Sequence, residues 1–101
     1  MVYLVTLKES INSSSELRVL EWHVREGETC EQGQLLVELE SFKAVIEIFA
    51  AQSAVLRQIR VPAGQTQALG KPIAVLSDTA DEELPTDFAR LTEMAVEYSF
   101  M

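Results

Sequence analysis

The residues best suited to chemistry are one lysine and the acids around it. Lys43 stands in the short stretch 41–44, between two runs of alternating apolar residues, and Glu40 and Glu47 flank that stretch. A lysine supplies a primary amine on a long flexible stem, and such an amine can form a stable amide with a carboxylic acid. The plainer interpretation is a solvated turn lysine. Two carboxylates alone do not predict a hydrolase, because nothing else in the chain indicates a substrate pocket.

Cysteine and histidine usage argues against several other kinds of site. The chain has one cysteine, Cys30, and one histidine, His23, so it predicts neither an internal disulfide, nor a Cys/His metal site, nor a Cys–His catalytic pair. Cys30 falls in a polar turn and is interpreted as an incidental thiol, while His23 is expected to face solvent. We predict no metal site and no catalytic residue, and a reducing compartment such as the cytoplasm.

Composition and charge narrow the class of protein. The chain of 101 residues has the size of one domain, with 48% hydrophobic residues and a net charge of −8. Residues 1–77 hold nine acids and seven bases, whereas residues 78–101 hold seven acids and one base, so the negative charge gathers in the tail. An acidic chain disfavours nucleic acid and anionic membranes as partners. The first residues predict no signal peptide, and no apolar run is long enough to span a membrane.

An internal repeat sets the expected architecture. Residues 17–39 and 54–76 match at a shift of 37 positions. The matched pairs are Trp22 with Ile59, Val24 with Val61, Gly27 with Gly64, Thr29 with Thr66, Gly33 with Gly70, Leu36 with Ile73 and Leu39 with Leu76. Two glycines six residues apart, recurring among matched apolar positions, indicate a duplicated β unit.

Each unit predicts a strand, a glycine turn, a polar stretch and a second strand. The strands are expected at Val2–Leu7, Leu17–Val24, Leu35–Glu40, Ala44–Phe49, Val55–Val61 and Ile73–Leu76, within a total of six to eight. The fold class predicted is therefore all-β, a small flattened β-barrel or sandwich of two quasi-symmetric units. The first unit ends near Glu40 and the next strand starts at Ala44, so residues 41–44 should form a tight hairpin at one pole. The equivalent position after the second unit is where the chain leaves the domain, which should lie toward the other pole.

The acidic C-terminal tail is predicted to form a segment separate from the domain. Residues 1–77 are expected to form the domain, and residues 78–101 an acidic linker with a short C-terminal helix. Thr86 could cap that helix, which would run to about Tyr98. Phe88, Leu91, Ala95 and Tyr98 would then share one face, either packed on the barrel or docked on a partner.

From residue 2 to residue 77 the chain resembles the biotinyl/lipoyl attachment family, and most closely the lipoyl domains of 2-oxoacid dehydrogenase acyltransferase components. The residues that carry the resemblance are Val19-Leu20-Glu21-Trp22-His23-Val24-Arg25-Glu26-Gly27-Glu28-Thr29, Gly33-Gln34-Leu35-Leu36, Glu38-Leu39-Glu40-Ser41-Phe42-Lys43-Ala44-Val45-Ile46-Glu47-Ile48 and Val61-Pro62-Ala63-Gly64. Their order and spacing together are more specific than any one of these stretches.

The resemblance implies a carrier rather than an enzyme. Lipoate would be amide-linked to Lys43, and the hairpin residues Glu40, Ser41, Phe42 and Ala44 would help partners to recognise it. The lipoyl-lysine would shuttle acyl groups within a 2-oxoacid dehydrogenase complex. The implied partners are a lipoate-attaching enzyme, the 2-oxoacid dehydrogenase, the acyltransferase core and dihydrolipoamide dehydrogenase.

Departures from the family pattern keep two alternatives open. Phe42 stands where these lipoyl domains usually have Asp, and Ala54 replaces a usual glycine. Phe42 moves the motif toward the biotin type, in which methionines flank the lysine, so a biotin carrier of a carboxylase is one alternative. The other is an unmodified interaction module with the carrier fold. Phe42 itself could fold back onto the barrel or contact a partner enzyme.

Overall fold

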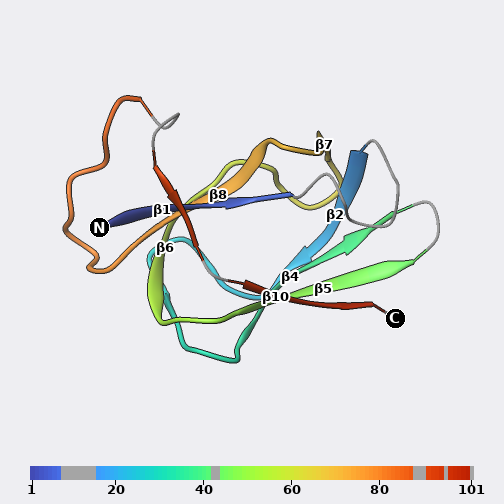
Figure 1. The fold of residues 1–101 in the computed structure, drawn as a ribbon, viewed down its shortest axis with the longest axis horizontal. Helices are drawn as coiled ribbons and strands as arrows, with labels where there is room; N and C mark the ends of the chain where they lie inside the picture. Colours follow the sequence, from blue (N-terminus) through green and yellow to red (C-terminus); the bar gives the residue numbers. More distant parts are fainter. Residues whose placement is uncertain (8–15, 42–43, 88–90, 95, 101) are drawn as a thin grey trace.

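Strands are the only regular secondary structure in the part of the chain that the structure describes. The computed structural model describes residues 1–7, 16–41, 44–87, 91–94 and 96–100. Within these ranges there are ten strands, against the six to eight expected, and no helix (Figure 1). The strands are β1 Val2–Thr6, β2 Glu16–Trp22, β3 Thr29–Cys30, β4 Leu35–Glu40, β5 Val45–Ala50, β6 Ala54–Ile59, β7 Thr66–Ala68, β8 Pro72–Ser77, β9 Thr92–Glu93 and β10 Val96–Phe100.

The strands form two five-stranded sheets that enclose one main core. One sheet has the order β3-β6-β8-β1-β9, and the other has the order β10-β5-β4-β2-β7. Both sheets contribute fully buried side chains to the core, among them Ile73 from β8 and Leu39 and Ile46 from the β4–β5 pair. Buried residues alternate with exposed ones along most of β2 and with half-buried ones along β5, as expected of strands with one face on the core. This flattened sandwich confirms the all-β fold class.

The two repeat units are related by matching backbone hydrogen bonds. The amide of Gly27 donates to the carbonyl of Leu56 over 2.7 Å, and the amide of Gly64 donates to the carbonyl of Val19 over 2.8 Å. Each donor and each acceptor is 37 residues from its counterpart, so the units contact one another symmetrically. Gly27 and Gly64 have φ of +90° and +92°, a backbone conformation that other residues rarely adopt.

The tail adds an edge strand to each sheet. β9 pairs in parallel with β1, and β10 pairs antiparallel with β5, from Val96 beside Ala50 to Phe100 beside Ile46. The predicted C-terminal helix is therefore wrong. Met94 is buried in the core, and Val96 and Tyr98 pack against it, so alternate residues face inward as in a strand. Leu91 and Tyr98 also fit the spacing of a helix. The tail nevertheless forms strands, because it pairs with the edges of the two sheets.

Cys30 also differs from its expected place. It lies in β3 rather than in a polar turn, its side chain is fully buried, and its Sγ donates to the carbonyl of Ala54 over 3.2 Å. His23 is exposed, as predicted. Among the described residues, none belongs to a helix with the length and apolar character needed to cross a membrane.

Candidate functional site

The candidate site is the end of the sheet where β4 gives way to β5. These neighbouring strands pair antiparallel, and Glu40 at the end of β4 lies opposite Val45 at the start of β5. The fully buried Leu39 and Ile46, one residue further from the turn on either strand, face each other in the register and anchor the hairpin to the core. The position of this turn therefore follows from the burial pattern of the two strands.

Ser41 and Ala44 close the hairpin through three hydrogen bonds. The backbone amide of Ser41 donates to the carbonyl of Ala44 over 2.9 Å. The Ser41 hydroxyl donates to that same carbonyl and accepts from the Ala44 amide, each over 3.1 Å. Ser41 is 8% exposed, and its hydroxyl is thus used for holding the turn. Phe42 and Lys43, the two residues between, lie outside the described residues.

The described neighbours leave the turn approachable. Glu40 is exposed and Ala44 is only half-buried. Glu40 lies opposite Arg18 of β2 as well as Val45 of β5, so both cationic and acidic side chains stand near this end of the sheet. Of the predicted site residues, the structure thus brings Glu40, Ser41 and Ala44 together at one hairpin. The predicted roles of Lys43 and Phe42 stay predictions.

The other pole of the molecule holds the start of the chain and the end of the second unit. The amide of Asp78 donates to the carbonyl of Met1 over 3.1 Å, and Asp78 is the residue 37 positions after Ser41. Val2 lies opposite Ser77 as Val45 lies opposite Glu40, so Met1 takes the place of Ala44 and the Met1–Asp78 contact is the counterpart of the Ser41–Ala44 contact. In Figure 1 the N-terminus and the end of β4 lie toward opposite ends of the long axis, as the internal repeat predicts.

Charged groups stabilise this distant pole. The N-terminal ammonium pairs with Asp78 over 3.0 Å and also with Glu82. The hydrogen bond from the ammonium, with a second from the Tyr3 hydroxyl, lowers the pKa of the Asp78 carboxyl. Hydrogen bonds to Glu82 and Asp78 in turn raise the pKa of the ammonium. These ion pairs hold the two ends of residues 1–78 together at the pole away from the hairpin.

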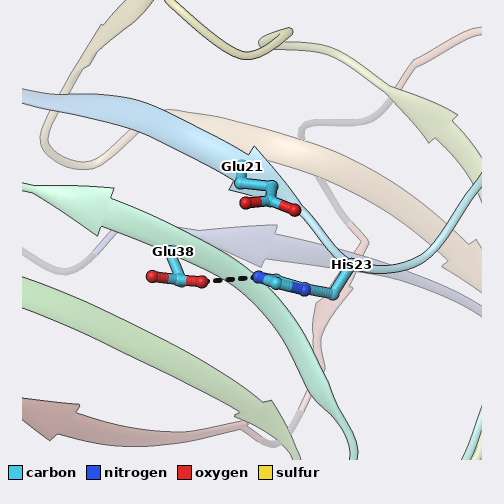
Figure 2. Close-up of side chains that lie close together, drawn as sticks. All are labelled: Glu21, His23 and Glu38. Atoms are coloured by element: carbon cyan, nitrogen blue, oxygen red, sulfur yellow. Dashed lines mark hydrogen bonds and ion pairs between the residues drawn. The ribbon is translucent and has the colours of Figure 1, made fainter.

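One group of side chains was not predicted from the sequence. Glu21, His23 and Glu38 bring three potential ligand atoms within 4.8 Å of one another on the exposed face of the second sheet (Figure 2). The spacing of Glu21 and His23 is a usable signal, because residues two apart on an extended chain share a face. Glu38 joins them through the β2–β4 register, which sequence spacing alone does not give.

The chain is similar to carrier-domain proteins over most of its length. A family model described as "Biotin-requiring enzyme" matches residues 8–76. The dihydrolipoyllysine-residue succinyltransferase component of the 2-oxoglutarate dehydrogenase complex from Bacillus subtilis (strain 168) is 33% identical over 78 residues, which are 77% of this chain and 19% of that protein. The dihydrolipoyllysine-residue acetyltransferase component of the pyruvate dehydrogenase complex from Zymomonas mobilis is 30% identical over 69 residues, covering 67% of this chain and 16% of that protein. The chain therefore spans less than a fifth of the length of these relatives.

A solved structure matches in fold as well. The lipoyl domain of the 2-oxoglutarate dehydrogenase complex from Azotobacter vinelandii superposes with a TM-score of 0.66 at 25% identity. The match covers 74% of this chain and 95% of that domain.

Proposed function

Because the chain belongs to the biotin/lipoyl attachment family, we propose that it is a lipoyl carrier domain with lipoate amide-linked to Lys43. In this role it would shuttle acyl groups between the active sites of a 2-oxoacid dehydrogenase-type complex. It would act as a substrate of its partner enzymes. The partners proposed are a lipoate-attaching enzyme, the 2-oxoacid dehydrogenase, the acyltransferase core and dihydrolipoamide dehydrogenase.

The observation that carries the proposal is the closure of the hairpin around Lys43. Ser41 and Ala44 are joined by three hydrogen bonds, and Lys43 is one of only two residues between them. The strands that lead to this turn are anchored by the buried Leu39 and Ile46. Lys43 thus belongs to a turn whose two ends are held by hydrogen bonds. Such a turn suits an amine that several enzymes must reach, because the structure beside the amine is ordered.

The residues beside Lys43 fit an attached lipoyl group. The amine nitrogen of Lys43 would bond to an activated carboxyl carbon, releasing the activating group and a proton. Glu40 is exposed and Ala44 is half-buried, which supports access of an attaching enzyme to this turn. Once attached, lipoate supplies a disulfide that is reduced as it takes up an acyl group and is later reoxidised. The protein then contributes position, because tethering raises the effective concentration of the arm near each active site.

The relatives favour lipoate over biotin. The matched family model takes its description from biotin-requiring enzymes, whereas the relatives in Bacillus and Zymomonas are named for dihydrolipoyllysine. The Azotobacter domain is a lipoyl domain. Biotin and an unmodified interaction module are therefore outcomes that the experiment must distinguish.

Mass spectrometry of the intact chain tests the proposal directly. The chain should be produced in cells that lipoylate other proteins, followed by peptide mapping across residues 40–47. We expect the mass increment of one lipoyl amide, located on Lys43. Lys43→Arg should abolish it, whereas the control Lys71→Arg, at an exposed lysine elsewhere, should keep it. A mass increment of one biotinyl group would instead indicate a biotin carrier of a carboxylase. An unmodified Lys43 would favour the unmodified interaction module.

A further inference from the structure

Glu21, His23 and Glu38 form a cluster on the face of the sheet that points away from the core. Glu21 is in β2, His23 follows the end of β2, and Glu38 is in β4. Nε2 of His23 lies 2.6 Å from Oε1 of Glu38, and Figure 2 shows the Glu21 carboxylate directed toward the same imidazole. One potential ligand atom from each residue lies within 4.8 Å of the other two.

The strand register places like charges next to each other at this cluster. Glu21 pairs with Glu38 across β2 and β4, and Glu38 pairs with Glu47 across β4 and β5. Directly opposed residues point to the same face of a sheet, and like charges in such pairs destabilise it. One imidazole reaches one member of this row of three acids through a hydrogen bond. The row therefore has an excess of negative charge that a bound cation would offset.

The donor set indicates which cation fits. Two carboxylates and an imidazole supply oxygen and nitrogen ligands, a combination suited to zinc and its first-row neighbours rather than to calcium or magnesium, which prefer oxygen alone. Three protein ligands with the remaining positions open to water is an arrangement that zinc adopts. We propose that Glu21, His23 and Glu38 form a surface site for a divalent transition metal ion, with Zn²⁺ as the ion to test.

Small side-chain rotations would complete the geometry. Ligand atoms about 2.0–2.2 Å from a tetrahedral zinc ion lie roughly 3.3–3.6 Å from one another. The three donors already lie within 4.8 Å, and they belong to exposed or half-buried side chains that can rotate. The metal would replace the proton that now links His23 and Glu38. The sequence-based expectation of no metal site considered only Cys and His as ligands, whereas two of these three ligands are glutamates.

Calorimetric titration of the full chain with ZnCl₂ tests the site. We expect one Zn²⁺ per chain. His23→Ala and Glu21→Gln should each weaken binding by about tenfold or more, since even changes to groups around metal ligands cost that much. The matched control is Glu16→Gln, which removes the same charge from the far end of β2 and should leave binding unchanged.

NMR gives an independent measurement, because His23 is the only histidine in the chain. Its ring resonances need no assignment by mutagenesis, and stoichiometric Zn²⁺ should shift them. Equal Zn²⁺ binding by the parent chain and His23→Ala, or ring resonances that Zn²⁺ leaves unmoved, would overturn the proposal. Lys43→Arg should bind Zn²⁺ as the parent chain does, so this site and the proposed attachment of lipoate can fail separately.

Discussion

Ser41 and Ala44 are held together by the backbone amide of one and by a serine hydroxyl that acts as donor and acceptor at once. Removing that hydroxyl tests whether it orders the hairpin. Ser41→Ala should lower the free energy of unfolding by about 1–2 kcal/mol, because two hydrogen bonds at a buried position are lost. It should also slow the proposed attachment of lipoate to Lys43. Urea denaturation and the initial rate of lipoylation measure the two effects.

The control for that change is Ser53→Ala, at an exposed serine outside the hairpin, which should alter neither quantity. If Ser41→Ala matched this control in both measurements, the hydroxyl would have no part in ordering the turn.

The paired glycines predict two equal losses of stability. A Cβ at Gly27 or Gly64 meets no atom within 4 Å, so the cost of alanine there arises from the positive φ alone. That cost is about 1–2 kcal/mol for each site. Gly27→Ala and Gly64→Ala should therefore destabilise the chain by similar amounts in urea denaturation. Asparagine, which tolerates positive φ better, should cost less at either site, and a loss as large as alanine's would refute the conformational explanation.

Packing of the tail can be tested at Met94. The side chain is 4% exposed and belongs to the main core, so Met94→Ala should lower the free energy of unfolding by about 2–5 kcal/mol. Glu93→Ala, at the exposed neighbouring position in β9, should change it by less than about 0.5 kcal/mol. Thermal and urea denaturation measure both. Equal stability of the two variants would mean that the tail does not pack on the carrier domain.

Cys30 makes alkaline stability depend on pH. Burial of the side chain raises the pKa of its thiol in the folded state. Between the ordinary thiol pKa and the raised one, the unfolded chain releases its proton while the folded chain keeps it, so the free energy of unfolding falls as the pH rises. This fall should be smaller in Cys30→Ala. The native thiol should also react slowly with a disulfide reagent until urea unfolds the chain, and fast reaction in the native state would contradict the burial.

The internal repeat made the body of the fold predictable. Gly27 and Gly64 sit at equivalent turns, and the strands beginning near residues 2, 17, 35, 44, 55 and 73 appear within two residues of their expected bounds. A duplicated pattern is informative because an arrangement of polar and apolar residues that arises by chance in one copy seldom recurs at the same positions of the other copy.

The tail was mispredicted because two periodicities coexist in it. Leu91 and Tyr98 fit a helical stripe, while Met94, Val96 and Tyr98 alternate as in a strand. Free edges on β1 and β5 favour the second pattern, and the existence of those edges is a property of the folded domain.

The pairing of Glu21 with Glu38 could not be predicted from the sequence for a related reason. A bulge between Val19 and Glu21 sets the register of β2 against β4, and the spacing of residues in the sequence does not reveal that bulge.

The course of β10 has a practical consequence for handling the protein. Its antiparallel pairing with β5 carries the backbone of Phe100 to the side of Ile46, near the hairpin, while Met1 lies at the distant pole. Figure 1 shows the two termini toward opposite ends of the molecule. An affinity tag or fluorescent reporter fused behind the last strand would crowd the hairpin that Ser41 and Ala44 close. The same fusion in front of Met1 would leave that end clear for a ligase, a blotting antibody or an immobilised partner.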